Sequence, residues 1–180
     1  LASQFGEAQA VRVDTDLAGL DTSIVSNVIG AQDAPEPFND DTALTAFLKL
    51  RRLNIPKKDL FFVVNPDAFY GAGGLLKQAR FSDADKTGLS KSTSLTGEIT
   101  HPVFGAPAYE SNVLSIRGAS RACFLMHPEA MAIAMSYNNR VEKVRRTSAL
   151  VLSTVVVNTS LYGVLIGRET HACKLFLKDS

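Results

Sequence analysis

The stretch Leu60-Phe-Phe-Val-Val64-Asn65-Pro66-Asp67 joins a short apolar segment directly to a helix start. Its first five residues are apolar, and most of them are β-branched or aromatic, which is typical of a strand buried on both faces. Asn65 offers an N-cap, and Pro66 fits the first helical position because it has no amide proton to donate. The stretch therefore predicts a buried strand that runs into a helix.

Helical patterns precede this unit. Apolar residues recur every three or four positions between Glu7 and Ile29, which predicts one amphipathic helix. A proline-containing linker follows. A second helix is expected over Thr42 to Leu53, with Asp40 or Asp41 as its N-cap and basic residues in its last turns.

The sequence after the central unit is mostly of β type. We expect a strand over Cys123 to Met126, a helix over Pro128 to Met135, separate strands over Ala149 to Val157 and Val164 to Ile166, and a last strand over Cys173 to Leu177. Helices and strands do not alternate as regular βαβ units. The predicted class is therefore α+β.

Composition excludes several classes of protein. The 180 residues include 19 Lys+Arg and 18 Asp+Glu, so a net charge of +1 argues against binding nucleic acid through blanket positive charge. The longest apolar stretch, Ala149 to Val157, is shorter than the roughly 20 residues that span a bilayer. The two cysteines, Cys123 and Cys173, have no CxxC spacing, and we expect both to be buried thiols. Because the chain begins at Leu1 without an initiator Met, we expect a processed or partial chain.

The sequence offers little catalytic chemistry. No two of its histidines, His101, His127 and His171, have the spacing of a helical metal site, and the ring of His127, just before Pro128, is better placed to cap or to pack at that junction. The glycine run Gly71 to Gly74 lacks the Gly-Lys-Ser/Thr ending of a phosphate-binding loop. We therefore predict no catalytic, cofactor-binding or metal site and no enzymatic activity.

One charged cluster stands out, formed by Arg140, Glu142, Lys143, Arg145 and Arg146. Such a run can be a solvated surface, a contact with nucleic acid phosphates, or a contact with acidic groups of another subunit. Because the whole chain is close to neutral, we favour the subunit contact.

The order of several short motifs resembles that of tailed-bacteriophage major capsid proteins with the HK97-type fold. No single motif is specific, but their succession and spacing are similar over roughly Asp41 to Lys178. The segments that carry the resemblance are Thr42 to Leu53, Asn54-Ile55-Pro56, Leu60 to Pro66, Gly105 to Asn112, Cys123 to Met135, Tyr162-Gly163, and Arg168 to Ala172.

The resemblance implies an α+β, HK97-like capsid fold in three parts. Residues 1–40 would be the end of the spine helix and a linker of the peripheral domain, and residues 41–136 the axial domain. Residues 137–180 would be a peripheral-domain segment followed by C-terminal strands that return to the axial domain. It also implies that this chain lacks the N-terminal arm, the extended two-stranded loop and most of the spine helix.

The implied function is that of a major head protein. Copies would assemble into pentamers and hexamers of an icosahedral virion shell, built in the host cytoplasm around double-stranded DNA without sequence-specific contact. Decoration or portal proteins would be further partners, and no membrane or cofactor is implied. Besides the charged cluster, the polar loop Phe81 to Gly97 would be either a capsomer contact, with Asp83, Asp85, Lys86 and Lys91 as candidate interface residues, or a mobile axial tip. The alternatives are an encapsulin-like nanocompartment shell, a small cytoplasmic enzyme that uses a histidine, and a nucleic-acid-binding module.

Overall fold

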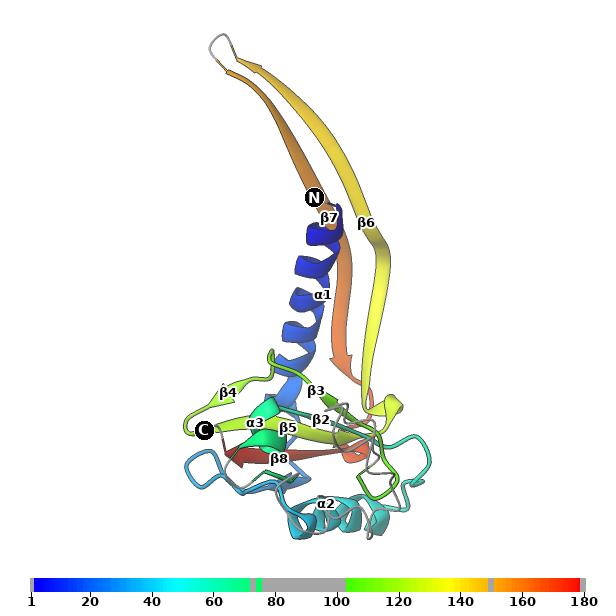
Figure 1. The fold of residues 1–180 in the computed structure, drawn as a ribbon. Coiled ribbons are helices and arrows are strands. Elements are labelled where there is room, and N and C mark those ends of the chain that lie inside the picture. The colour runs from blue at the N-terminus through cyan, green and yellow to red at the C-terminus, as the bar shows by residue number, and fades with distance from the viewer. Residues whose placement is uncertain (1, 72–73, 76–102, 149–150, 179–180) are drawn as a thin grey trace, which may run out of the picture.

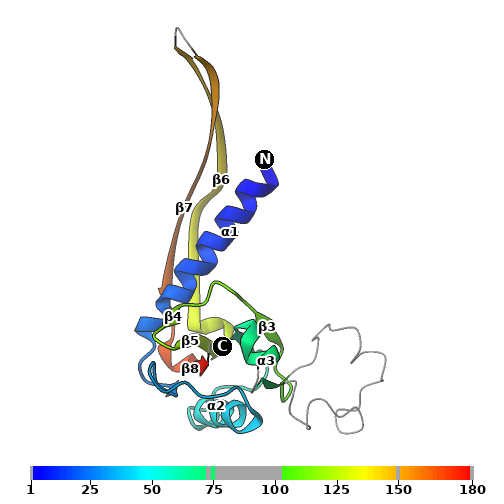
Figure 2. The same cartoon turned by 60° about the vertical axis from the view of Figure 1, so that its left-hand side comes forward.

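The structure is a computed structural model that describes residues 2–71, 74–75, 103–148 and 151–178. Figures 1 and 2 show a small α+β body from which a long two-stranded ribbon projects, with the helix α1 (Ala2–Ala18) lying beside the ribbon. In both views the sheet of the body lies between the helix α2 (Asp40–Arg52) and the ribbon. The predicted α+β class is confirmed.

The sheet of the body has two long central strands. Its order is β1-β8-β5-β2-β3, with β4 paired to β5 on one side. The strands are β1 (Val28–Ile29), β2 (Phe61–Val64), β3 (Ala108–Glu110), β4 (Ile116–Arg117), β5 (Ser120–Met126) and β8 (Ala172–Lys178). β5 is antiparallel to β8 and to β2, whereas β1 pairs in parallel with β8 and β3 with β2. The last strand of the chain therefore lies at the centre of the sheet.

Burial explains why these segments form strands. β5 and β8 pair over their full lengths, from Ser120 opposite Lys178 to Met126 opposite Ala172. Both strands are buried along almost every residue, on both faces. β2 adds alternating buried positions at Phe62 and Val64. The strand predicted from the central stretch is confirmed, but its predicted burial on both faces is wrong, because Phe61 and Val63 are only half-buried and line a groove.

A cluster of aromatic rings joins the helices to the sheet. The ring of Phe62 in β2 lies 5.6 Å from that of Phe38 and 5.5 Å from that of Phe47 in α2, both edge to face. Phe38 also meets Phe69 in α3 (Pro66–Tyr70) at 5.9 Å. Such edge-to-face pairs are worth about 0.5–1.5 kcal/mol each beyond their burial. These rings link α2 and α3 to β2 in a core that also includes buried residues of β5 and β8.

The predicted helix caps differ from those observed. α2 begins one residue after Asn39, whose side chain accepts a 2.7 Å hydrogen bond from the amide of Thr42, so Asp40 and Asp41 lie in the first turn. α3 starts at Pro66 as predicted, but Asn65 makes no capping bond. The Asn65 side chain is buried and accepts a hydrogen bond from the thiol of Cys123 instead. Packing against β5 therefore outweighs capping at this position.

The N-terminal helix is shorter than predicted. α1 ends at Ala18, a 3-10 turn η1 covers Gly19–Ser23, and the chain reaches the sheet as β1 at Val28. Asp21, which falls inside the predicted helix, instead lies in this turn, where it is buried and bonded to Arg117 of the sheet.

The ribbon is the largest departure from expectation. β6 (Met131–Ser148) and β7 (Val151–Ile166) pair as antiparallel strands from Met131 opposite Ile166 to Ser148 opposite Val151. The helix predicted over Pro128 to Met135 is wrong, because only η3 (Pro128–Ala130) is helical. The break predicted at Asn158 to Gly163 is also wrong, since β7 is continuous there. Although the resemblance implied that the extended two-stranded loop is absent, the chain does form a long two-stranded element.

Candidate assembly surfaces

The five residues of the predicted charged cluster all lie on β6, in the part of the ribbon toward its tip. The guanidinium Nε of Arg140 lies 2.8 Å from Oε1 of Glu142, and both side chains are exposed. Lys143 is exposed as well. Arg145 and Arg146 occupy register positions opposite Thr154 and Ser153 of β7. The structure therefore brings the cluster together on one projecting strand, whereas the loop candidates Asp83, Asp85, Lys86 and Lys91 lie outside the described residues.

The two strands of the ribbon differ in chemistry. β7 contains no charged residue, whereas β6 carries four basic residues and one acidic residue. Along β7, exposure alternates between the described side chains, and the even-numbered positions from 156 to 166 are half-buried. The exposed large apolar residues are Val157 (43%), Leu161 (53%) and Leu165 (50%), which we call the β7 stripe.

α1 lies along the ribbon and is held there by a polar contact. The hydroxyl of Tyr162 in β7 donates a 2.6 Å hydrogen bond to Oδ2 of Asp16. Arg12 approaches the same carboxylate at 3.3 Å. The hydrogen bond to Asp16 raises the pKa of Tyr162, so the phenol stays protonated as a donor. This contact ties the C-terminal part of α1 to the ribbon, and toward its N-terminus the helix diverges from the ribbon (Figure 2).

A groove of about 350 Å³ lies where α1, the sheet and the base of the ribbon meet. Apolar side chains from α1, β2, β3, β5 and β6 contribute most of its lining, among them Leu17, Phe61, Val63, Tyr109, Met131 and Ile133. Among the described residues that line it, the charged ones are Asp14 and Glu110, and both are exposed. Within the described part of the chain, the groove is therefore an apolar surface with acidic groups at its lining.

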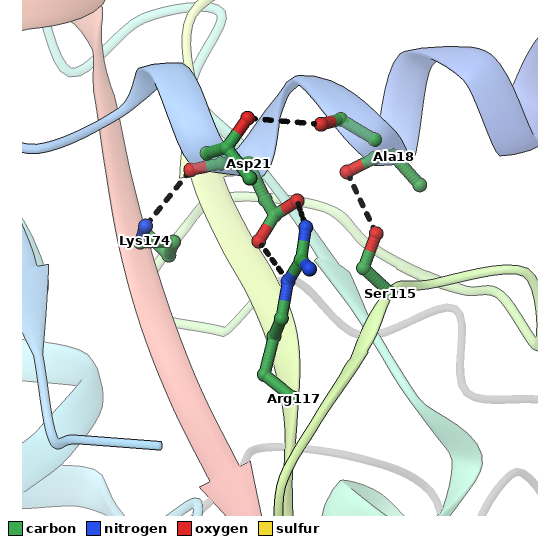
Figure 3. A network of polar contacts seen from close by, with 7 residues as sticks. Ala18, Asp21, Ser115, Arg117 and Lys174 are labelled. Atoms are coloured by element: carbon green, nitrogen blue, oxygen red, sulfur yellow. Dashed lines mark hydrogen bonds and ion pairs between the residues drawn. The ribbon is translucent and has the colours of Figure 1, made fainter.

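A network of polar contacts joins η1 to the sheet (Figure 3). Asp21 is 1% exposed, and Arg117 of β4 donates two hydrogen bonds to its carboxylate, from Nε to Oδ2 at 2.9 Å and from Nη2 to Oδ1 at 2.6 Å. The bond to Asp21 raises the pKa of the guanidinium. Two parallel charge-assisted bonds fix both position and orientation, which a single contact does not. The pair thus locks the end of α1 against the sheet.

Lys174 reinforces the same joint from β8. Its ammonium donates a 2.8 Å hydrogen bond to the backbone carbonyl of Asp21, and it lies 5.1 Å from the ring centre of Phe176. Burial lowers the pKa of Lys174, although the negative charge of Asp21 opposes the shift. Ser115 adds a hydrogen bond of 3.1 Å to the carbonyl of Ala18, the last residue of α1. Arg117 of β4, Ser115 just before β4 and Lys174 of β8 therefore all bond to the end of α1 and the turn η1 that follows it.

Glu169 holds the segment that follows η1. Its Oε1 accepts hydrogen bonds from the amides of Val25 (2.7 Å) and Ser26 (2.8 Å) and from the Ser26 hydroxyl (2.5 Å). These bonds, with the hydroxyl contributing most, lower the pKa of Glu169. Glu169 belongs to η4 (Glu169–His171), the turn between the ribbon and β8. The base of the ribbon and the entry to β1 are thus tied together.

None of these joint contacts was predicted from the sequence. Asp21 and Arg117 are 96 residues apart, and Glu169 is 143 residues from Ser26. A local pattern cannot pair residues at such distances. In the sequence, Asp21 lies inside the predicted amphipathic helix, where an Asp normally marks a solvated surface.

The described residues carry no metal-binding group of three or more His, Cys, Asp or Glu. His127 caps η3 as predicted, accepting a hydrogen bond from the Glu129 amide, and His101 lies outside the described residues. Both cysteines are buried and outside any disulfide, as predicted, and burial raises the pKa of Cys173 to about 12. No helix in the described ranges has the length and apolarity needed to cross a membrane.

Comparison with known proteins gives matches among solved structures alone. No protein-family model and no curated protein matches the chain. A chain from Mycobacterium phage Che8 superposes with a TM-score of 0.74 at 22% identity, covering 94% of this chain and 60% of that one. A chain from the capsid of cyanophage P-SCSP1u gives 0.74 at 15% identity, with coverage of 99% and 65%. The SrpI encapsulin of Synechococcus elongatus PCC 7942 gives 0.65 at 14% identity, with coverage of 98% and 64%.

These matches define the class of fold. The chain has the HK97-type capsid fold, which phage capsid chains and an encapsulin share. It spans about 60–65% of the length of these neighbours. Because every identity is below a quarter, the likeness establishes the fold and leaves the biological role to be argued from the molecule.

Proposed function

We propose that this protein is the major head protein of a tailed phage, with a structural and non-enzymatic role. Copies assemble into pentamers and hexamers that close an icosahedral virion shell around double-stranded DNA, without sequence-specific contact and without a membrane. Assembly takes place in the host cytoplasm, and decoration or portal proteins bind the finished lattice. The observation that carries the proposal is the superposition of nearly the whole chain on phage capsid chains.

The proposed domains follow the path of the chain. The axial domain comprises residues 41–136, which hold α2, α3 and most of the sheet. Residues 1–40, with α1, belong to the peripheral domain, and residues 137–180 comprise a peripheral-domain segment, which holds most of the ribbon, followed by a C-terminal part that returns to the axial domain. The position of β8 between β1 and β5 supports a C-terminal strand that returns to the axial domain.

The charged cluster on β6 is the proposed subunit contact. It lies on a strand that projects from the body, where a neighbouring copy can reach it (Figure 1). Reversing both charges in the double variant Arg145→Glu/Arg146→Glu should reduce the yield of particles measured by sedimentation. An unchanged yield would remove this cluster from the interface. Soluble, folded subunits from the variant would show that the loss concerns assembly.

A nanocompartment shell is the second candidate, because the encapsulin match covers 98% of the chain. The contents of the particles separate the two functions. A head protein predicts nuclease-protected double-stranded DNA inside particles from infected cells, whereas a nanocompartment predicts protein cargo and no protected DNA.

A further inference from the structure

The ribbon is connected to the sheet through two short links that lie against each other. The first link runs from β5 through η3 into β6, and the second runs from β7 through η4 into β8. The amide of His127 in the first link donates a 3.0 Å hydrogen bond to the carbonyl of His171 in the second. The amide of Gly167 donates one of 2.9 Å in the other direction, to the carbonyl of Ala130. A change at this contact therefore acts on both strands of the ribbon at once.

Four side chains lie at the contact between the links, and we call them the ribbon clamp: His127, Glu129, Arg168 and His171. Oε2 of Glu129 lies 3.0 Å from Nη1 of Arg168 and 3.9 Å from Nε2 of His171. The two imidazole rings lie edge to face with their centres 5.8 Å apart. The His171 side chain is only 18% exposed, so water screens a charge on it less than on an exposed side chain. The clamp thus places two titratable rings and one guanidinium near a single carboxylate.

The hydrogen bond at His127 fixes the charge of that ring. Its Nδ1 accepts a hydrogen bond of 3.3 Å from the backbone amide of Glu129. An imidazole nitrogen accepts a hydrogen bond only when it carries no proton, so His127 is neutral in this arrangement. A second proton on the ring would turn Nδ1 into a donor that faces another donor, and the cap of η3 would be lost. The closed clamp therefore requires a neutral His127.

Charge repulsion acts in the same direction as the loss of the cap. When His171 is protonated, the Glu129 carboxylate already faces two cations, the His171 ring and the Arg168 guanidinium. Protonation of His127 would then add a positive charge on a ring whose centre lies 5.8 Å from that of His171. The clamp can therefore hold one additional proton but not two.

The remaining charged groups of the described elements that meet here do not compensate a second proton. Oε1 of Glu169 is bonded to the amides of Val25 and Ser26, and its charge interacts with that of Lys174. β6 has no charged residue before Arg140, and β7 has none at all. Protonation of both histidines would thus leave the clamp with excess positive charge.

We propose that the ribbon clamp is a proton-sensitive lock, which holds the base of the ribbon against the sheet and opens when His127 is protonated. His171 can take up a proton without loss of the clamp, because the resulting imidazolium lies beside the Glu129 carboxylate. Histidine is the side chain whose charge normally changes between about pH 5 and 8. The clamp is therefore closed at the upper end of that range and opens toward the lower end. This inference goes beyond the proposed function, and it applies to the single folded chain whether or not copies assemble.

Hydrogen exchange of the whole chain tests the lock, measured by mass spectrometry at about pH 7.5 and about pH 5.5 and corrected for the intrinsic effect of pH on exchange. The amides of residues 129–131 and 167–171 should exchange about fivefold faster at the lower pH, which is the factor expected when one capping bond is lost. His127→Asn keeps a side-chain acceptor that does not titrate, so these amides should stay protected at both pH values. His171→Gln removes one of the two positive charges, so it should reduce the pH effect without abolishing it.

Three results would overturn the inference. The first is exchange at the two links that does not change between the two pH values in the wild type. The second is a pH response of His127→Asn equal to that of the wild type, because another group, such as Glu129, would then be responsible. The third is equally accelerated exchange in the centres of β5 and β8, which would mean that the whole sheet unfolds in acid. Since the measurement concerns the single chain, its failure leaves the proposed function, which imaging of particles tests, unaffected.

Discussion

Replacing Arg117 by methionine removes one partner of the buried joint between η1 and the sheet. Methionine retains much of the apolar stem, but it leaves the Asp21 carboxylate buried without its two charge-assisted bonds. Breaking a buried pair from one side costs about 3–5 kcal/mol. Because the Arg117 side chain is 32% exposed and Lys174 remains near Asp21, we expect the lower end, about 3 kcal/mol of unfolding free energy.

Two matched variants serve as comparisons for the unfolding free energy of Arg117→Met. Asp21→Asn keeps the shape and leaves only the partly exposed guanidinium unpaired, so it should cost less, about 1–2 kcal/mol. Arg140→Met removes an ion pair whose side chains are 74% and 52% exposed, and it should change stability by less than about 0.5 kcal/mol. Urea unfolding at pH 7, followed by circular dichroism, gives all three values. The reasoning is refuted if Arg117→Met costs less than about 1 kcal/mol or less than Asp21→Asn.

Three further predictions concern the pH dependence, a glycine and the thiols. The pKa of Glu169 is lower in the folded chain than the unfolded value of about 4.3, so its ionised form stabilises the fold above that pH, and this stability is lost as pH falls through the lower folded pKa. Glu169→Gln should therefore flatten the acid limb of a curve of Tm against pH. Parallel curves for the variant and the wild type would exclude this contribution. Gly30→Ala should cost about 1–3 kcal/mol, because φ is +75° and the new Cβ would lie 3.0 Å from a β8 carbonyl, whereas Gly163→Ala, with open space around it, should be nearly neutral in the same urea titration. Cys123 and Cys173 should resist a thiol reagent until the chain is unfolded, and rapid labelling of the native protein would contradict their burial.

The elements that the sequence predicted correctly are those determined by a few neighbouring residues. The apolar run from Leu60 and the proline at position 66 gave β2 and the start of α3, because burial and a missing amide proton act within a few residues. The cap by His127 and the apolar character of Cys173 to Leu177 were equally local, and both are present.

The ribbon could not be predicted from one strand at a time. Met131 to Met135 consists of residues that favour helices, yet it is a strand because β7 pairs along it. The polar segment Asn158 to Gly163 was expected to separate two shorter strands, but it continues β7 because β6 pairs along it. Tertiary contacts therefore overrode propensity in both strands.

The candidate surfaces likewise include one feature that the sequence predicted and others that it could not predict. The charged cluster was visible as a run in sequence, and the structure places it on one strand. The joint of Asp21, Arg117 and Lys174 was invisible, because its members come from three distant segments. The groove likewise needs α1, the sheet and the ribbon to be in place before it exists.

Electron microscopy of the purified protein tests the central claim most directly. The account predicts closed, uniform icosahedral shells in which pentamers and hexamers are resolved, with α1 and the ribbon of each copy lying over its neighbours. A protein that remains monomeric at high concentration, with a single small species in sedimentation and no particles on the grid, would contradict it.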